Sequence, residues 1–338
     1  MIVSPRPSSD HDTDWPRVQL HIVTGKGGTG KTTVAASLAL ALASRGQQVL
    51  LCEVENRQGI AQLFDVPPLP YEERRIARGA DGQGAAGDVY ALAIEPEAAL
   101  MDYLAMYYRL GRAGKLLDRF GVIDFATTIA PGVRDVLLTG KVYEAARRRE
   151  GRDFAYDAVI MDAPPTGRIT RFLNVNSEVA GLAKVGPIRR QADSIMEMMR
   201  STDTRVHIVT VLEEMPVQET IDGIAELSSA RLPIGHVILN LVRPPLLNAG
   251  TRAALEAGKV KTAAVGRSLS STGLDDSAAP ELIAGGVAHL ERQQLQEEQR
   301  DILLDCGRPL VELPALTGGI DLGALFELAE TLKSEGVA

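Results

Sequence analysis

Residues 25 to 32 read Gly-Lys-Gly-Gly-Thr-Gly-Lys-Thr, and this run constrains the fold more than any other part of the chain. It satisfies the phosphate-loop frame G-x-x-x-x-G-K-[ST] through Gly25, Gly30, Lys31 and Thr32. The frame needs glycines because the backbone must curl until its N–H groups point at a β-phosphate. Lys31 then reaches the β- and γ-phosphate oxygens, and the Thr32 hydroxyl joins the ligands of a Mg²⁺ ion.

The flanking residues place this loop between a strand and a helix. Residues 18–23 alternate like a strand, whereas 33–45 are rich in alanine and leucine and end at Gly46 like a capped helix. The free N–H groups and the dipole of a helix N-terminus favour an anion at that point. We therefore expect ATP with Mg²⁺ at this loop. The expected contacts to the nucleotide are Gly25, Gly27, Gly28, Thr29, Gly30, Lys31, Thr32 and Thr33.

Composition excludes several classes of protein. The chain has 338 residues, of which 45% are hydrophobic, and its net charge of −8 argues against nucleic acid as the main partner. No apolar run approaches the roughly 18 residues of a membrane span, so we expect a cytoplasmic protein with at most transient membrane contact. Residues 1–17 are rich in Ser, Pro and Asp, and we expect them to form a disordered leader.

The remainder, residues 18–338, alternates short apolar strands with helical stretches, which predicts an α/β fold with a doubly wound, mostly parallel sheet. Residues 96–150 are expected to be an inserted helical subdomain at the carboxyl edge of that sheet. Residues 79–87 and 262–280 are expected to be loose connections. The strands expected after the first are 49–52, 89–94, 158–161, 206–212, 237–239 and 310–313.

A second chemical signature follows one of these strands. Asp162 comes directly after the apolar run 158–161 and precedes Ala-Pro-Pro-Thr-Gly. An aspartate at the carboxyl end of such a strand lies where ligands bind, and it can hold a water of the Mg²⁺ shell. The alternative is a turn that merely ends the strand, which Asp, Pro and Gly also favour.

Lys26 is not required for nucleotide binding, and one interpretation makes it a solvated surface charge. The other is a cation that meets the charge on a departing γ-phosphoryl group, as an arginine finger does. The run Gly25 to Thr32 resembles the deviant phosphate loop of dimeric ATPases that include the septum-site and partition proteins. That resemblance implies that Lys26 reaches across a nucleotide-sandwich dimer.

The resemblance narrows at residues 162–173, Asp-Ala-Pro-Pro-Thr-Gly-Arg-Ile-Thr-Arg-Phe-Leu. This run resembles switch II of the arsenite-pump ATPases and of the ATPases that deliver tail-anchored membrane proteins, D-x-x-P-T-G-H-T-L-R-F-L, with Arg168 in place of the histidine. The chain also resembles actinobacterial members described as anion-transporting ATPases. The resemblance spans about residues 18–332 and implies that Asn240 binds adenine and that Pro314 belongs to the loop over the base.

Switch I departs from that family. The family pattern S-T-D-P-A-H-N-L, whose aspartate positions the attacking water, becomes Glu-Val-Glu-Asn-Arg-Gln-Gly-Ile at residues 53–60. Glu55 takes the place of the aspartate, Gln58 takes that of the histidine, and Glu53 is a rival for the catalytic role. Glu55 is otherwise only a residue that ends a strand. Since a misplacement of about 1 Å can cost 10²-fold in rate, turnover is expected to be slow or partner-dependent.

The sequence predicts no zinc or metalloid site. Such sites need clustered thiolates, and the chain has only Cys52 and Cys306, far apart, with no closely spaced pair among its five histidines. An energising role in an arsenite or other anion pump, which is one alternative function, therefore lacks its thiol cluster.

The expected function is that of a dimeric Mg²⁺-ATPase, paired with itself or with a homologous ATPase, that handles a hydrophobic client such as a tail-anchored membrane protein. Residues 98–117 carry apolar side chains at helical spacing, and 195–199 are rich in methionine, a residue common on adaptable binding surfaces. These stripes either form a client groove or pack inside the protein. A further alternative is a nucleotide-gated scaffold of weak activity that pairs with a homologous ATPase.

Overall fold

The computed structural model describes residues 18–55, 57–80, 86–108, 131–174 and 187–337. The expected leader lies outside these residues. The strands in chain order are β1 (Leu20–Gly25), β2 (Val49–Glu53), β3 (Arg74–Arg78), β4 (Asp88–Ala93), β5 (Arg149–Glu150), β6 (Asp153–Phe154), β7 (Ala158–Asp162), β8 (Thr204–Thr210), β9 (Ile234–Val242) and β10 (Leu310–Pro314).

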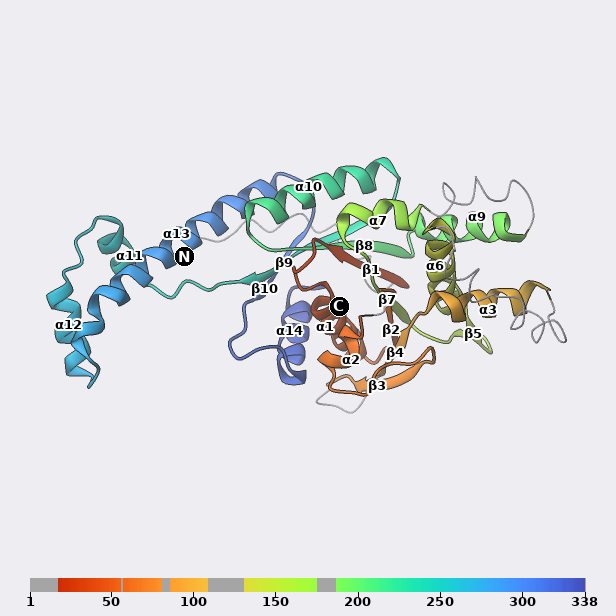
Figure 1. Ribbon diagram of the computed structural model, residues 1–338, viewed down its shortest axis with the longest axis horizontal. Helices are drawn as coiled ribbons and strands as arrows, with labels where there is room; N and C mark the ends of the chain where they lie inside the picture. Colours follow the sequence, from red (N-terminus) through yellow and green to blue (C-terminus); the bar gives the residue numbers. More distant parts are fainter. Residues whose placement is uncertain (1–17, 56, 81–85, 109–130, 175–186, 338) are drawn as a thin grey trace.

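The helices cover both faces of the sheet and extend beyond one of its edges (Figure 1). They are α1 (Lys31–Ala43), α2 (Gly59–Leu63), α3 (Pro96–Tyr108), α6 (Pro131–Arg147), α7 (Thr166–Leu173), α9 (Pro187–Met199), α10 (Glu214–Ser229), α11 (Ala249–Glu256), α12 (Thr262–Ser271), the 3₁₀ turn η2 (Asp276–Ala278), α13 (Ala279–Leu304) and α14 (Leu322–Ser334).

The main sheet has eight strands in the order β10-β9-β8-β1-β7-β2-β4-β3. Every neighbouring pair is parallel except β3 and β4. The predicted doubly wound, mostly parallel α/β fold is therefore confirmed, and each of the seven expected strands lies in this sheet. The order reverses around β1, the strand that leads into the phosphate loop, and such a reversal opens a ligand crevice at the carboxyl ends.

Strand β3 was not expected, and its sequence explains why. Its residues read Arg-Arg-Ile-Ala-Arg, and all three arginines are exposed. Because this strand lies at the edge of the sheet, it carries no long apolar run, and charges on an edge discourage pairing with another chain.

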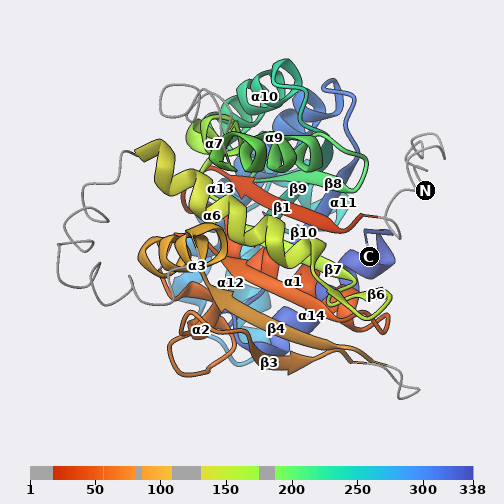
Figure 2. The same cartoon turned by 90° about the vertical axis from the view of Figure 1, so that its right-hand side faces the viewer.

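Alternation along the strands assigns side chains to two apolar layers. Ile22 and Met161 point to the layer that contains helices α6, α7 and α9, whereas Val23 and Ile160 point to the layer that contains α1 and α14. Side chains alternate between the faces of a strand, so adjacent residues necessarily enter different layers. Figure 2 shows α6, α7 and α9 lying across the front of the strands.

The segment that was expected to be an inserted subdomain contains α3 and α6, while residues 109–130 lie outside the described residues. This segment was expected to lie at the carboxyl edge of the sheet, and for α6 that prediction is wrong. Val142, Ala145 and Ala146 of this helix are buried in the same apolar layer as Ile22, so α6 covers a face of the sheet.

The expectation of a loose connection at 262–280 is wrong, because these residues form α12, η2 and the start of α13. Ser, Thr and Gly suggested a loop, but the alanines in this stretch have the highest intrinsic helix propensity. The other loose connection was expected at 79–87, and its residues 81–85 lie outside the described part of the chain.

Three histidines meet inside the sheet on β1, β8 and β9. The backbone N–H of His236 donates to Nδ1 of His207, and Nε2 of His207 lies 3.2 Å from Nδ1 of His21. Burial, with a smaller contribution from the nearby charge of Arg205, lowers the pKa of His21 to about 3, against a backbone hydrogen bond at Val18 that raises it. Burial also holds the pKa of His207 well below its usual value.

These histidines predict a loss of stability in mild acid. The unfolded chain takes up protons as the pH falls below about 6.5, whereas folded His21 stays neutral down to about 3. The contribution of these histidines to the free energy of unfolding is therefore fully present above pH 6.5. It falls as the pH drops from about 6.5 to about 3, by at most about 1.4 kcal/mol per pH unit for each histidine. Urea unfolding at pH 7.5 and 5.0 measures this.

The variant His21→Gln should have a smaller pH slope than the wild type, even if it is less stable at every pH. His289→Gln, on α13 and outside this cluster, is the control and should retain the slope. Equal slopes in all three proteins would contradict the assignment to His21.

Candidate functional site

The phosphate loop connects the end of β1 to the start of α1, as its sequence predicts. A side chain at Gly25 would collide with the carbonyl oxygen of Val209 on β8, and one at Gly30 would collide with the amide of Asn240 on β9. Gly30 also has φ +87°, a left-handed conformation that favours glycine. Neighbouring strands thus hold the loop, and both glycines are required by its geometry.

The interior of the loop is formed by its own polar groups. The Thr29 hydroxyl and the Lys31 ammonium donate to the carbonyl oxygen of Lys26, at 2.9 and 3.3 Å. The Asn240 amide donates to the carbonyl oxygen of Thr29 at 2.9 Å. Burial lowers the pKa of Lys31, while Asp162 and Glu55 oppose that shift. Lys31 therefore lies within the electrostatic influence of two carboxylates.

The Thr32 hydroxyl donates to Oδ2 of Asp162 over 2.7 Å. The second oxygen, Oδ1, is buried and has no hydrogen-bond partner. Desolvation, with a smaller contribution from the charges of Glu53 and Glu55, raises the pKa of Asp162 to about 6, against the opposing effects of Thr32 and Lys31. A carboxylate oxygen without a partner beside a hydroxyl is a donor set that fits Mg²⁺, a cation that prefers oxygen ligands.

Switch II is attached to the same strands. Asp162 ends β7 opposite Val23 of β1, and the Thr24 hydroxyl donates to the carbonyl oxygen of Pro164 over 2.6 Å. The turn after Asp162 therefore lies against the last residues before the phosphate loop, and a shift of one segment must be felt by the other.

The two glutamates of switch I have different environments. Glu53 is 2% exposed, and its Oε1 accepts the backbone N–H groups of Arg57 and Gly59 at 2.7 and 3.2 Å. Glu55 instead lies 3.3 Å from Arg57 and 4.0 Å from Arg168 of switch II. Glu53 is thus committed to the shape of the loop, whereas Glu55 forms ion pairs with two exposed arginines.

The side chain of Gln58 is bonded to the chain that follows switch I. Its side-chain amide exchanges two hydrogen bonds with the backbone of Leu69, at 2.7 and 3.1 Å, and its own backbone has φ +56°. Although this position corresponds to the family histidine, its side chain connects switch I to the segment that precedes β3.

Lys26 has a partner that the sequence did not indicate. Its Nζ lies 3.0 Å from Oε1 of Glu219 on α10, and both side chains are partly exposed. The two residues are far apart in the sequence, and no sequence pattern linked them.

The remaining expected site residues lie around this centre. Gly27 and Gly28 are exposed at the tip of the loop, and Thr33 is half-buried in the first turn of α1. Asn240 and Pro314 lie on the adjacent strands β9 and β10, near their carboxyl ends (Figure 1). The fold thus brings all the expected site residues to one edge of the sheet.

Two features are absent from the described residues. No helix in this part of the chain is sufficiently long and apolar to cross a membrane. Within the same residues, no group of three or more His, Cys, Asp or Glu side chains could hold a metal ion. Cys52 is buried on β2, and burial raises the pKa of its thiol far above the usual range.

The chain matches the family model of the anion-transporting ATPases over residues 18–204. It is 47% identical to the ATPase BagA of Mycobacterium tuberculosis over 343 aligned positions, which cover 99% of this chain and all of the relative.

More distant relatives cover less of the chain. The ATPase GET3 of Rhodotorula glutinis is 24% identical over 71% of this chain and 74% of its own length. An Aquifex aeolicus protein provisionally named arsenical pump-driving ATPase 1 is 28% identical over 58% of this chain and 47% of its own.

The variant Asp162→Asn tests the metal assignment. The amide can still accept from Thr32, but the charge that would attract Mg²⁺ is lost, so the increase in ATP affinity on adding Mg²⁺ should shrink. The thermal stability of the free protein should not fall, because a buried carboxylate with a raised pKa disfavours folding at pH 7. Titration of a fluorescent ATP analogue with and without Mg²⁺ measures the first effect.

Asp157→Asn is the matched control, since that carboxylate only accepts from the backbone of Gln48. If Asp162→Asn retains the full Mg²⁺ dependence, or melts well below the wild type, the oxygen without a partner is not a metal ligand.

Proposed function

Because the chain belongs to the anion-transporting ATPase family, we propose that it is a cytoplasmic, dimeric Mg²⁺-dependent ATPase whose nucleotide state controls the handling of a hydrophobic client. The observation that carries the ATPase chemistry is the pair Thr32 and Asp162, with one carboxylate oxygen buried and without a partner beside the phosphate loop. In this proposal Lys31 binds the β- and γ-phosphates, and the Asn240 and Pro314 edge holds the base.

Magnesium, bound near Thr32 and Asp162, would neutralise charge on the phosphates. The chain's own residues would do the rest. Glu55 is our candidate for orienting the attacking water, because Glu53 already holds two backbone N–H groups of switch I. Lys26 would approach the γ-phosphate of a partner subunit after releasing Glu219.

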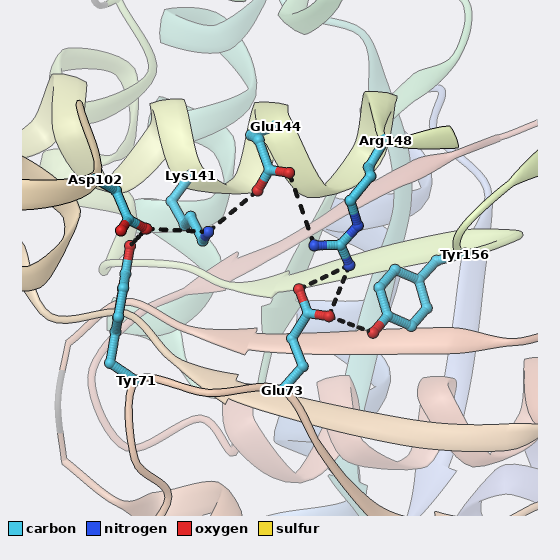
Figure 3. Close-up of polar contacts among 7 residues, drawn as sticks. All are labelled: Tyr71, Glu73, Asp102, Lys141, Glu144, Arg148 and Tyr156. Atoms are coloured by element: carbon cyan, nitrogen blue, oxygen red, sulfur yellow. Dashed lines mark hydrogen bonds and ion pairs between the residues drawn. The ribbon is translucent and has the colours of Figure 1, made fainter. Parts of the chain in front are cut away.

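A polar network supports coupling between switch I and the helices (Figure 3). Gln58 of switch I holds Leu69, and two residues later the Tyr71 hydroxyl donates to Asp102 of α3 over 2.8 Å. Lys141 of α6 also contacts Asp102, at 3.3 Å. Movement of switch I would therefore be transmitted to α3 and α6.

The same segment is attached a second time. Glu73 accepts two hydrogen bonds from Arg148, at 2.6 and 2.8 Å, and one from the Tyr156 hydroxyl at 2.7 Å. These charge-assisted bonds hold the end of α6 and the start of β7 to the chain that follows switch I. A ligand can shift such an arrangement only as far as its affinity differs between the two states.

The client surface in this proposal is α3. Met101 is 39% exposed, whereas Leu100 is buried. The side chains of the remaining members of the 98–117 stripe lie outside the described residues. The second methionine-rich stretch is part of the core, because Ile195, Met196, Met198 and Met199 are all buried in the layer beneath α6. Residues 195–199 therefore pack inside the protein, which was the alternative to a client groove.

Two other functions are weaker candidates. A scaffold of low activity, paired with a homologous ATPase, is favoured by the contacts of Glu55 with Arg57 and Arg168, which occupy the carboxylate. An anion or arsenite pump would need accessible clustered thiols, and Cys52 is fully buried. Turnover of the purified chain, alone and with a homologue, separates the enzyme from the scaffold.

The two lysines of the loop should differ in their roles. Lys31→Ala should abolish tight ATP binding, because it removes the cation closest to the phosphates. Lys26→Ala should bind ATP nearly normally but turn over roughly 10³-fold more slowly. Nucleotide titration and phosphate release measure the two effects. Equal loss of affinity would make Lys26 another part of the cradle, and full activity would make it a surface charge.

The two glutamates of switch I should also differ in their roles in hydrolysis. Glu55→Gln should keep ATP and Mg²⁺ affinity and lower the single-turnover rate by at least about 10²-fold. Glu53→Gln is the control, since its amide oxygen can still accept from Arg57 and Gly59. The reverse outcome, with normal hydrolysis only in Glu55→Gln, would assign the water to Glu53.

Client handling predicts an apolar surface that depends on nucleotide. Binding of a tail-anchor peptide should differ between ADP and a non-hydrolysable ATP analogue, and the triple variant Met101→Ser, Leu104→Ser, Tyr108→Ser should remove that difference. Met215→Ser, an exposed methionine on α10, is the control. No nucleotide-dependent binding, with or without a homologous partner chain, would exclude client handling and favour the scaffold. Unfolding of the triple variant would place the stripe in the core.

A further inference from the structure

Switch I carries an arginine, Arg57, at the position where the family pattern S-T-D-P-A-H-N-L has alanine. The exchange puts a long, permanently charged side chain with five N–H donors in the place of a methyl group. This side chain is 68% exposed, so packing does not fix its rotamer. An exposed arginine acquires a chemical role only if its backbone is held beside the site.

Hydrogen bonds to a buried carboxylate hold the backbone of Arg57 beside the phosphate loop. Glu53, which is 2% exposed, accepts the backbone N–H of Arg57 at 2.7 Å and that of Gly59 at 3.2 Å. A side chain at Gly59 would come within 3.3 Å of the methyl carbon of Thr32, so this part of switch I lies directly against the loop. Arg57 is therefore two residues away from a backbone position that contacts the proposed magnesium ligand Thr32.

The guanidinium of Arg57 lies among the charged groups of the site. One of its nitrogens is 3.3 Å from Oε2 of Glu55. Burial lowers the pKa of Lys31, and the charge of Arg57 adds a smaller lowering, against the charges of Asp162 and Glu55. Charges influence each other in this way only when they are close in space. A phosphate held by Lys31 thus has a second cation of the same chain nearby.

We propose that Arg57 is an arginine finger that acts on the γ-phosphate bound by its own subunit, an inference that rests on the proposed ATPase function. In hydrolysis the water oxygen forms a bond to the γ-phosphorus, and the bond from this phosphorus to the β–γ bridging oxygen breaks. The electron pair of that bond stays on ADP, and the proton lost by the water is held by the inorganic phosphate. The guanidinium, turned from Glu55 to the phosphate, donates N–H groups to the oxygens on which charge develops.

The same rotation changes the surroundings of Glu55. Arg57 and Arg168 both contact this carboxylate. When Arg57 turns to the phosphate, Glu55 loses the nearer of the two cations and can accept a hydrogen bond from the attacking water. This role differs from that of Lys26, which would act on the γ-phosphate of a partner subunit.

Kinetics and nucleotide binding of the full chain with Arg57→Ala test the proposal. Its kcat should fall roughly 10³-fold while its affinity for a non-hydrolysable ATP analogue changes less than about twofold, because the contact is made only in the transition state. ADP with aluminium fluoride mimics the transferring phosphoryl group, so it should raise the melting temperature of the wild type but not that of Arg57→Ala. Arg57→Lys should recover only part of kcat, since lysine keeps the charge but lacks the planar fork of donors.

Arg168→Ala is the matched control, because Arg168 contacts the same carboxylate and is 62% exposed. It loses only a contact that holds Glu55, so it should turn over at least as fast as the wild type and should still respond to ADP with aluminium fluoride. Equal kcat values in the two alanine variants, or an Arg57→Ala variant as fast as the wild type, would overturn the proposal and leave Arg57 as a charge that balances Glu55.

Loss of affinity for the ATP analogue in Arg57→Ala would also overturn it, because the arginine would then bind the ground state. These outcomes all require a wild type that hydrolyses ATP, and they leave the proposed ATPase function intact. A wild-type chain without turnover, alone and with a homologue, would instead overturn the ATPase function together with this inference.

Discussion

The close approach of the phosphate loop to strands β8 and β9 is the constraint on which the rest of the site depends. Gly25 lies against the Val209 carbonyl, and Gly30 lies against the Asn240 amide, which in turn bonds to Thr29. The loop therefore keeps its shape only if β8 and β9 lie beside β1 in their observed order. The same order places Asp162 of β7 on the other side of β1, within reach of Thr32. The shape of the phosphate loop and the order of the strands therefore depend on each other.

The fold was predictable where the apolar pattern is strong. The central strands are nearly continuous apolar runs because helices cover both of their faces, and all of them were expected. Strand β3 escaped prediction because an exposed edge strand has no apolar run to detect. The helices at 262–278 escaped it for a related reason. They bury almost nothing, so their apolar periodicity is weak, and their alanines rather than any pattern make them helical.

The site was predictable where function fixes residue type at short spacing. Lys31, Thr32 and Asp162 follow from two local motifs, and parallel pairing of β1 and β7 necessarily brings those motifs together. The pairing of Lys26 with Glu219 and the exchange between Gln58 and Leu69 could not be foreseen. Each depends on the exact position of an element distant in the chain or of a loop without regular structure. The different environments of Glu53 and Glu55 depend on hydrogen bonds from backbone N–H groups, and the positions of those groups cannot be read from the sequence.

The departures from the family pattern at the two switches belong together. Glu55 is one methylene longer than the expected aspartate, and Arg168 replaces the expected histidine with a longer, permanently charged side chain. The two lie 4.0 Å apart, so each change places charge where the other can meet it. The charges of Glu53 and Glu55 help to raise the pKa of Asp162, against the charge of Lys31. An exposed arginine that balances Glu55 limits this repulsion. If Glu55 orients the attacking water as proposed, its rotation would break the contacts with Arg57 and Arg168, so the position of switch II would affect the chemistry at switch I.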